Sequence, residues 1–114
     1  MLVELLKVVA LLRALATGQV GVATTFWSID DPYNPDSGMA CYRGKKLVDS
    51  ARLVAHPTLP CKSRVFLYNL RTRKSTVAIV ADRGPKRALV DLSRGAAKAI
   101  GSNGMEQVLM FSLP

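Results

Sequence analysis

The chain has 114 residues, of which 16 are Lys or Arg and eight are Asp or Glu, so its formal net charge is +8. An apolar content of 49% excludes a disordered tail, and the length suits one compact domain. The positive charge favours an anionic partner such as nucleic acid, anionic lipid or an anionic wall polymer, although the same charge can simply keep a protein soluble.

The first 16 residues, MLVELLKVVALLRALA, would be apolar on almost every side of a helix. Lys7 and Arg13 interrupt the run of about 20 apolar residues that a membrane span requires. Two interpretations remain open: a signal or export segment, or a retained docking helix that contacts a protein partner or a membrane through residues 1–16. The sequence therefore divides into an apolar N-terminal segment, 1–17, and a folded domain, 18–114.

After residue 17 the pattern changes to short runs rich in Val, Ile, Phe and Tyr, separated by turn-forming residues. These runs predict six strands, over 21–27, 52–56, 64–70, 74–82, 87–91 and 106–111. One short helix is expected over 93–101, begun by Asp91 or Ser93 and ended by Gly101, despite Gly95 inside it. Because closure removes exposed strand edges, this content predicts a mainly β fold in the form of a small closed barrel.

The two cysteines, Cys41 and Cys61, are separated by a stretch that could form a loop. A disulfide closing about 20 residues would stabilise the fold by roughly 3 kcal/mol, but two unpaired thiols fit the sequence equally well. His56 is the only histidine, and neither cysteine has a partner at C-x-x-C spacing, so no metal site is expected. Phosphate-binding and nucleophile-elbow motifs are missing from the sequence.

The stretch ADRGPKRALVDLS, residues 81–93, contains the acid that is best placed for catalysis. Asp82 follows the apolar run VAIVA and would emerge at the end of a buried strand, where partial desolvation suits a general acid. The alternative is structural, with Asp82 accepting hydrogen bonds from the backbone of the turn at 83–85. Asp91 is interpreted as a helix cap. His56 either contacts a substrate, tunes Asp82, or is structural.

Several motifs follow one another in a distinctive order: ATTFW (23–27), SG (37–38), AH-x-TLP (55–60), DRGP (82–85) and DLS (91–93). This order resembles the double-psi β-barrel of rare lipoprotein A-like proteins, a family related to barwin and expansin barrels, and the resemblance covers about residues 19–112. It implies a six-stranded double-psi barrel, without a cofactor, located outside the cytoplasm. It also implies septal lytic transglycosylase activity on peptidoglycan glycan strands stripped of their stem peptides.

The resemblance implies a cleft that contains two matched residues. Asp82 matches the DRGP aspartate and would protonate the glycosidic oxygen, and His56 matches the histidine of the AH motif. Substrate contacts are expected from Arg83, Ser37, Tyr42 and Trp27.

The chain departs from the family pattern in the first loop. Catalytic relatives carry a glutamate directly after Ser-Gly, where this chain has Met39, so Asp36 or Asp49 is a candidate substitute acid. Cys61 and Lys62 replace the usual apolar residue and glycine after Leu-Pro.

Three functional hypotheses follow from these observations. The first is an enzyme that cleaves peptidoglycan glycan. The second is a non-catalytic wall-binding or structural barrel in an envelope or phage virion complex. The third, nucleic-acid binding, has the least support because few aromatic residues are available for base stacking.

Overall fold

A computed structural model describes residues 3–9, 18–25, 39–43 and 50–114. Its elements in chain order are β1 (Gln19–Thr25), β2 (Leu53–Ala55), β3 (Arg64–Asn69), β4 (Ser75–Asp82), β5 (Val90–Leu92), α2 (Arg94–Ala99) and β6 (Glu106–Ser112). Residues 3–9 are also helical, whereas 10–17 lie outside the described residues. The apolar helix expected over the first 16 residues therefore stays a prediction. Within the described ranges, no helix is long and apolar enough to cross a membrane.

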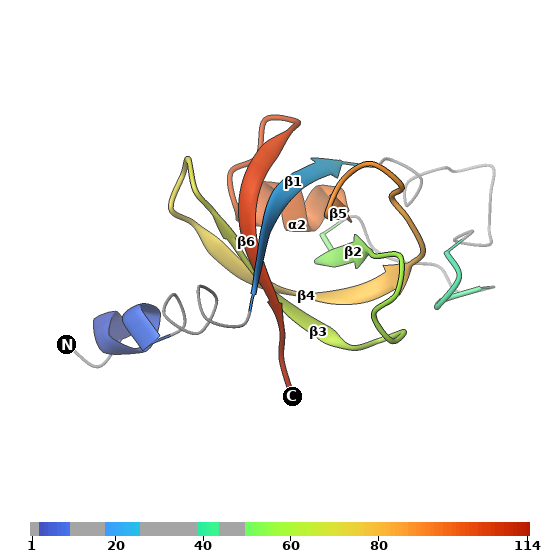
Figure 1. Cartoon of the computed structure of the whole chain (residues 1–114), viewed down its shortest axis with the longest axis horizontal. Coiled ribbons are helices and arrows are strands. Elements are labelled where there is room, and N and C mark those ends of the chain that lie inside the picture. The colour runs from blue at the N-terminus through green and yellow to red at the C-terminus, as the bar shows by residue number, and fades with distance from the viewer. Residues whose placement is uncertain (1–2, 10–17, 26–38, 44–49) are drawn as a thin grey trace.

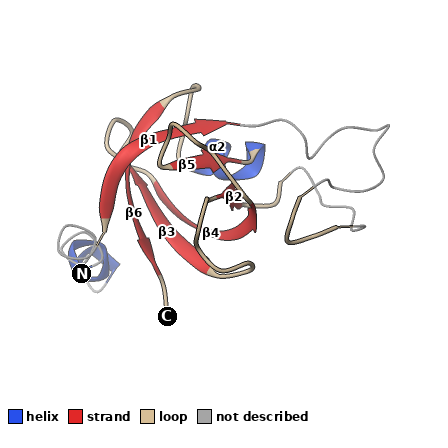
Figure 2. Ribbon diagram, turned by 45° about the vertical axis from the view of Figure 1, so that its right-hand side comes forward, coloured by secondary structure: helices blue, strands red, loops and turns tan. Residues whose placement is uncertain are grey.

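The six strands close into a barrel in the order β1-β5-β2-β4-β3-β6, as Figure 1 shows. The pairs β1–β5 and β2–β4 are parallel, and the remaining four pairs are antiparallel. Helix α2 packs against β2, β4 and β5 (Figure 2). The predicted mainly β fold, a closed six-stranded barrel with one short helix, is confirmed.

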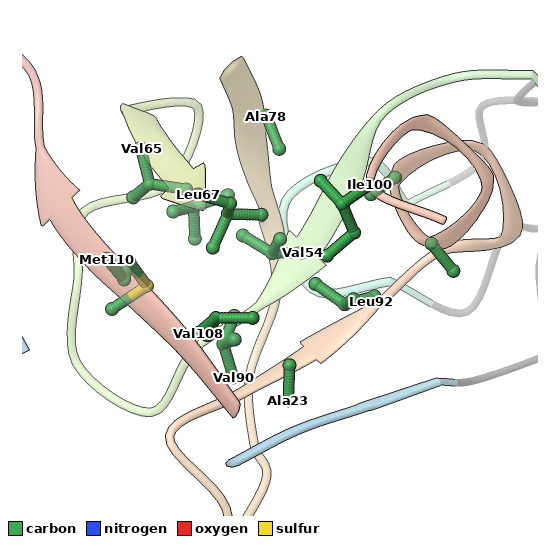
Figure 3. Close-up of a cluster of buried hydrophobic side chains, with 13 residues drawn as sticks. Ala23, Val54, Val65, Leu67, Ala78, Val90, Leu92, Ile100, Val108 and Met110 are labelled. Atoms are coloured by element: carbon green, nitrogen blue, oxygen red, sulfur yellow. The ribbon is translucent and has the colours of Figure 1, made fainter. Parts of the chain in front are cut away.

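The barrel interior is filled by small and branched apolar side chains on alternating strand positions, which is the pattern that strand geometry requires. Figure 3 shows Val54, Val90 and Val108 converging from three different strands. All three are fully buried, and each such side chain contributes about 1.5–3 kcal/mol when it leaves water. The same cluster includes Ala23, Val65, Leu67, Ala78, Val80, Leu92, Ala96, Ala97, Ile100 and Met110.

Of the two residues of the DLS motif that were expected to cap α2, Ser93 does so and Asp91 does not. Ser93 is the N-cap, because its side chain accepts a hydrogen bond from the Ala96 amide at 3.2 Å. Asp91 lies inside β5, so its interpretation as a helix cap is wrong. The strand expected over 87–91 is also shorter than predicted, since residues 86–89 form bends and β5 begins at Val90.

Ser93 and Gly95 join α2 to the chain that enters β2. The Ser93 hydroxyl accepts from the Leu53 amide at 2.9 Å and donates to the Ala51 carbonyl at 2.8 Å. A Cβ atom at Gly95 would overlap the carbonyl oxygens of Ser50 and Ala51. Glycine is therefore required inside this helix by close packing, which outweighs its poor helix propensity.

Candidate functional site

One row of residues crosses four neighbouring strands of the barrel. Thr24 on β1 pairs with Asp91 on β5, Asp91 pairs with Ala55 on β2, and Ala55 pairs in turn with Asp82 on β4. Residues paired across strands project from the same face of a sheet. Val90 and Leu92 beside Asp91 are buried in the core, so this row projects from the outer face of the barrel wall.

Asp82 reaches this row through a register irregularity between β2 and β4. Val54 pairs with Val80, but the next residue, Ala55, pairs with Asp82, so Ala81 is an extra residue on β4. Bulges of this kind redirect the following side chain. Strict alternation from the buried Val80 would have turned Asp82 toward the barrel interior. The bulge instead places Asp82 and Asp91 on one face, with Cα atoms roughly two strand spacings, about 10 Å, apart.

Asp91 is a half-buried carboxyl whose pKa is raised above its ordinary value of 3.8. Burial is the largest cause, and the negative charge of Asp82 acts in the same direction. Hydrogen bonds from the Thr24 hydroxyl and the Leu92 backbone lower the pKa but do not cancel the rise. Of the two aspartates in the row, Asp91 therefore has the environment that favours a proton donor.

Asp82 holds the backbone around it. Its Oδ1 atom accepts hydrogen bonds from the amide of Arg83 and from the amide of Ala40, both at 2.9 Å. The first is the turn contact expected from the sequence, and the second ties the described end of the long first loop to β4. Asp82 thus has the structural role that was one of its two interpretations. Its side chain is nevertheless half-exposed.

His56 is buried, with 8% of its surface exposed, and its ring is held by the loop that follows it. Nδ1 accepts hydrogen bonds from the amides of Thr58 and Leu59 at 3.2 and 3.0 Å, so the neutral ring carries its proton on Nε2. Burial and the charge of Arg83 lower the pKa of His56, which favours that neutral form. Near neutral pH the ring is thus a hydrogen-bond donor through Nε2.

His56 is linked to Asp82 through the backbone, because its amide donates to the Asp82 carbonyl at 3.0 Å. Its ring, however, lines a hollow of about 430 Å³ together with Thr58 and Leu59 of its own loop and with residues of β1 and β6. Neither aspartate is among the described residues that line this hollow. The side chains of His56 and the carboxyl pair thus occupy neighbouring but different surroundings.

The Arg83 guanidinium is engaged with the same loop. Nη1 donates to the carbonyls of His56, at 3.2 Å, and of Leu59, and Nη2 lies 3.6 Å from Sγ of Cys61. Through these contacts Arg83 holds the end of β4 against the TLP segment, residues 58–60. Its expected role as a substrate contact stays a prediction.

A disulfide joins Cys41 and Cys61, which the sequence alone left open. The Cys41 amide donates to the Ala81 carbonyl at 2.9 Å, so the bridge fastens the first loop beside the bulge. Met39, at the position of the family glutamate, is fully buried among Leu53, Ala81 and their neighbours. Its side chain is therefore part of a buried apolar cluster.

Four of the expected site residues lie outside the described part of the chain: Trp27, Asp36, Ser37 and Asp49. Asp91 and Thr24 are the site residues that sequence reasoning missed. The signal available was that Asp91 stands between two apolar residues, VDL, which is the pattern of an outward-facing strand position. Within the described ranges, no group of three or more His, Cys, Asp or Glu residues could hold a metal ion.

The chain is similar in sequence to several curated bacterial proteins. It is 40% identical over 77 residues to a probable endolytic peptidoglycan transglycosylase RlpA of Synechocystis sp., which is 64% of this chain and 24% of that protein. It is 46% identical over 52 residues to the endolytic peptidoglycan transglycosylase RlpA of Pasteurella multocida, which is 44% of this chain and 18% of that protein. The chain thus spans about a quarter or less of the length of these relatives. No family model matches it.

Solved structures with the same fold include a Clavibacter michiganensis expansin, with a TM-score of 0.67 and 18% identity over 86% of this chain and 51% of the expansin. A mutant of that expansin was solved in complex with cellohexaose. Cerato-platanin 3 from M. perniciosa aligns with a TM-score of 0.64 and 11% identity over 84% of this chain and 95% of its own. At these identities the similarity concerns the fold.

Proposed function

Because this chain is a rare lipoprotein A-like double-psi β-barrel, we propose that it acts on the glycan strands of peptidoglycan and cleaves them. The observation that carries this proposal is the pairing of Ala55 with both Asp82 and Asp91, which puts two carboxyl groups on one face. The RlpA relatives are peptidoglycan transglycosylases, which gives the substrate class of this proposal. The Cα atoms of Asp82 and Asp91 are two strand spacings, about 10 Å, apart, which leaves room for a sugar ring to lie across Ala55.

In this proposal Asp91 donates the proton. The glycosidic C1–O bond breaks as the Asp91 carboxyl protonates the leaving oxygen, and the 6-hydroxyl oxygen of the same sugar bonds to C1. The hydroxyl proton passes to the carboxylate that has just lost its own, so a single carboxyl group serves first as acid and then as base. The product carries a 1,6-anhydro ring, and no water is consumed.

Asp82 would then act as the second charge of the pair. Its Oδ1 is fixed by the amides of Ala40 and Arg83, so its carboxylate is held in one orientation. A fixed negative charge near C1 would stabilise the positive charge that develops there in the transition state. Sequence reasoning assigned the proton to Asp82, and the raised pKa of Asp91 is the reason to assign it to Asp91 instead.

The buried position of Met39 bears on which acid can serve. Met39 has no acidic group and its side chain is fully buried, so the position of the family glutamate supplies no acid in this chain. The acid must then come from the carboxyl pair or from Asp36 or Asp49 in the first loop. The proposal assigns the acid to the carboxyl pair, and the alternative is that Asp36 or Asp49 is the acid.

The proposed place of action is outside the cytoplasm. A disulfide between Cys41 and Cys61 persists in an oxidising compartment, where peptidoglycan is also found. The apolar side chains of residues 3–9 are more than half exposed, which suits an export segment or a docking helix. We accordingly keep residues 1–17 as a segment separate from the barrel, residues 18–114.

The test is a digest of peptidoglycan freed of stem peptides, with products identified by mass spectrometry. The wild type is expected to release 1,6-anhydro fragments, and Asp91→Asn to reduce the rate by about 10²- to 10⁴-fold. Asp82→Asn should give a smaller loss, and Asp36→Asn and Asp49→Asn are matched controls with the same change in charge. If only Asp36→Asn or only Asp49→Asn loses cleavage activity, the acid is that residue of the first loop and not Asp91.

The same digest distinguishes cleavage from binding alone. If the wild type releases no anhydro product but cosediments with peptidoglycan, the protein is a wall-binding barrel and the catalytic proposal is wrong. If it neither cleaves nor cosediments, its action on peptidoglycan is rejected altogether.

A further inference from the structure

Lys62 adopts a backbone conformation that side-chain-bearing residues rarely occupy. Its φ angle is 67°, in the left-handed region that favours glycine. The conformation is held from both sides, because the Lys62 amide donates to the Val80 carbonyl at 2.8 Å and the preceding residue, Cys61, is bridged to Cys41. Strained residues that the surrounding structure holds in place cluster at functional sites, so the lysine side chain itself needs an explanation.

The Lys62 ammonium lies over the ring of Tyr42, with Nζ 5.1 Å from the ring centroid. This distance is typical of a cation–π contact, which orients the ammonium without neutralising its charge. The contact occupies one side of the cation, and an ammonium group has three N–H donors. Lys62 is exposed, so this oriented cation faces solvent.

Both members of the contact are anchored beside the carboxyl pair. Lys62 is bonded to Val80, two residues before Asp82 on β4. Tyr42 is two residues after Ala40, whose amide binds the Asp82 carboxylate directly. Lys62 and Tyr42 lie in two different loops that the Cys41–Cys61 disulfide joins, and these short tethers place the cation beside the Asp82 end of the site.

We propose that Lys62, held over Tyr42, binds a carboxylate of the glycan substrate. This inference rests on the proposed function and names the substrate feature that is recognised. In glycan without stem peptides, each muramic acid residue carries a free lactyl carboxylate, which the Asp82 carboxylate would repel. A cation at the rim offsets that repulsion and favours the carboxylate-bearing glycan over a neutral polysaccharide.

The experiment measures binding of peptide-free peptidoglycan oligosaccharides and of the same oligosaccharides with their carboxyl groups converted to methyl amides. An inactive background, Asp91→Asn, prevents cleavage during the measurement. Lys62→Gly removes the ammonium and relieves the left-handed backbone, whereas Lys62→Arg keeps a cation. Arg73→Gly is the matched control, because Arg73 has a φ of 62° and the same charge but lies in the β3–β4 hairpin, at the opposite end of β4 from Asp82.

We expect the Asp91→Asn protein to bind the acidic glycan more tightly than the amidated glycan, with a difference that shrinks at high salt. Lys62→Gly should weaken binding of the acidic glycan by roughly three- to tenfold and leave binding of the amidated glycan unchanged. Lys62→Arg should keep most of the preference, and Arg73→Gly should keep all of it. Thermal unfolding of each variant shows whether the fold is intact.

Three results would overturn the inference: equal binding of the two glycans, no effect of Lys62→Gly, or an equal loss on both glycans. The last result would show that Lys62 acts through the structure of the loop. These failures are distinguishable from a failure of the proposed function, because cleavage is scored separately with the wild type. A barrel that cleaves without preferring carboxylates rejects only the role of Lys62, and one that prefers them without cleaving rejects only catalysis.

Discussion

The Thr24 hydroxyl donates a hydrogen bond to Asp91 Oδ1 at 2.8 Å, although the two residues are 67 positions apart in the chain. The bond exists because β1 and β5 run parallel and pair Thr24 with Asp91 in register. It stabilises the charged form of Asp91, against the larger effect of burial. The protonation of Asp91 is therefore adjustable by single substitutions on β1.

The first prediction concerns Thr24→Val, which keeps the shape of the side chain and removes its hydroxyl. Loss of this donor removes a cause that lowers the pKa of Asp91, so the pKa should rise further. If Asp91 is the acid, activity falls as pH rises through its pKa, and the alkaline limb of the pH–rate profile should move to higher pH in the variant. An unchanged limb, with the fold intact, would argue against Asp91 as the acid.

The second prediction concerns the stability of Asp91→Asn. Because the folded state raises the pKa of Asp91 above 3.8, the folded protein binds that proton more tightly than the unfolded chain does. Stability from this group is full below the unfolded pKa and is lost as pH rises through the folded pKa. Asp91→Asn should thus unfold at a higher temperature than the wild type at pH 7, and this gain should shrink as pH falls through the raised folded-state pKa and be absent below about pH 4. A variant that is less stable at pH 7 would contradict the burial cost inferred for Asp91.

A third prediction concerns Glu106, which is 5% exposed and is hydrogen-bonded by Arg71, Asn69 and the amide of Asn103. Arg71 donates to both of its carboxylate oxygens, with the shortest distance 2.6 Å, and the Asn103 amide donates to Oε1 at 3.1 Å. These contacts lower the pKa of Glu106 below its ordinary value of 4.5. Glu106→Gln should lower the thermal midpoint by about 5–10 °C at pH 7.

The pH dependence of that difference follows from the direction of the shift. A carboxylate with a lowered folded-state pKa contributes stability above its unfolded pKa and loses it as pH falls through the folded value. The midpoints of the wild type and Glu106→Gln should therefore converge below about pH 4. A constant difference down to pH 2 would indicate a packing effect instead of an ion pair.

The fourth prediction concerns Gly95→Ala in α2. Alanine improves helix propensity by about 1 kcal/mol, but its Cβ would meet the backbone oxygens of Ser50 and Ala51. Because backbone atoms cannot rotate away, we expect a net loss of about 1–3 kcal/mol in the free energy of unfolding. Denaturant unfolding measures this directly, and a stabilised variant would mean that α2 can move off the segment entering β2.

The fifth prediction concerns the bridge between Cys41 and Cys61, which are 20 residues apart. Replacing both by Ser should reduce the free energy of unfolding by about 3 kcal/mol, because the unfolded chain regains the entropy of an open loop. Reduction of the wild-type disulfide with a thiol should lower its free energy of unfolding by the same amount. The variant should also lose glycan cleavage, since the bridge fastens the loop whose Ala40 amide orients Asp82. Full activity in the variant would show that this loop is held without the bridge.

Much of the barrel could be predicted from local sequence. The run RVFLYN, and the run STVAIVAD as far as Val80, alternate buried with more exposed side chains, and they form β3 and β4 within one residue of the predicted ends. Ser93, Ala96 and Ala97 likewise marked the start and inner face of α2. These features depend on neighbours in the chain, which is why hydrophobic period and capping residues were sufficient to find them.

The site was less predictable because its geometry depends on pairing between distant segments. Asp91 reads locally as a helix cap, two residues before the true cap, and only the β1–β5 register reveals Thr24 as its partner. The direction of Asp82 depends on the bulge at Ala81, and the burial of Met39 depends on the packing of the first loop over β4. None of these contacts can be predicted from a stretch of only a few consecutive residues.

By itself the sequence determined the strand-forming runs, the capped helix, the excess of positive charge and the motifs that resemble those of rare lipoprotein A-like barrels. Tertiary structure alone decided that Asp82 and Asp91 share a face, that Cys41 meets Cys61 and that Lys62 is held over Tyr42. The physical reason is the range of the forces involved. Propensity and patterning act between near neighbours in the chain, whereas burial, charge and strand register act between residues that only the closed barrel brings together.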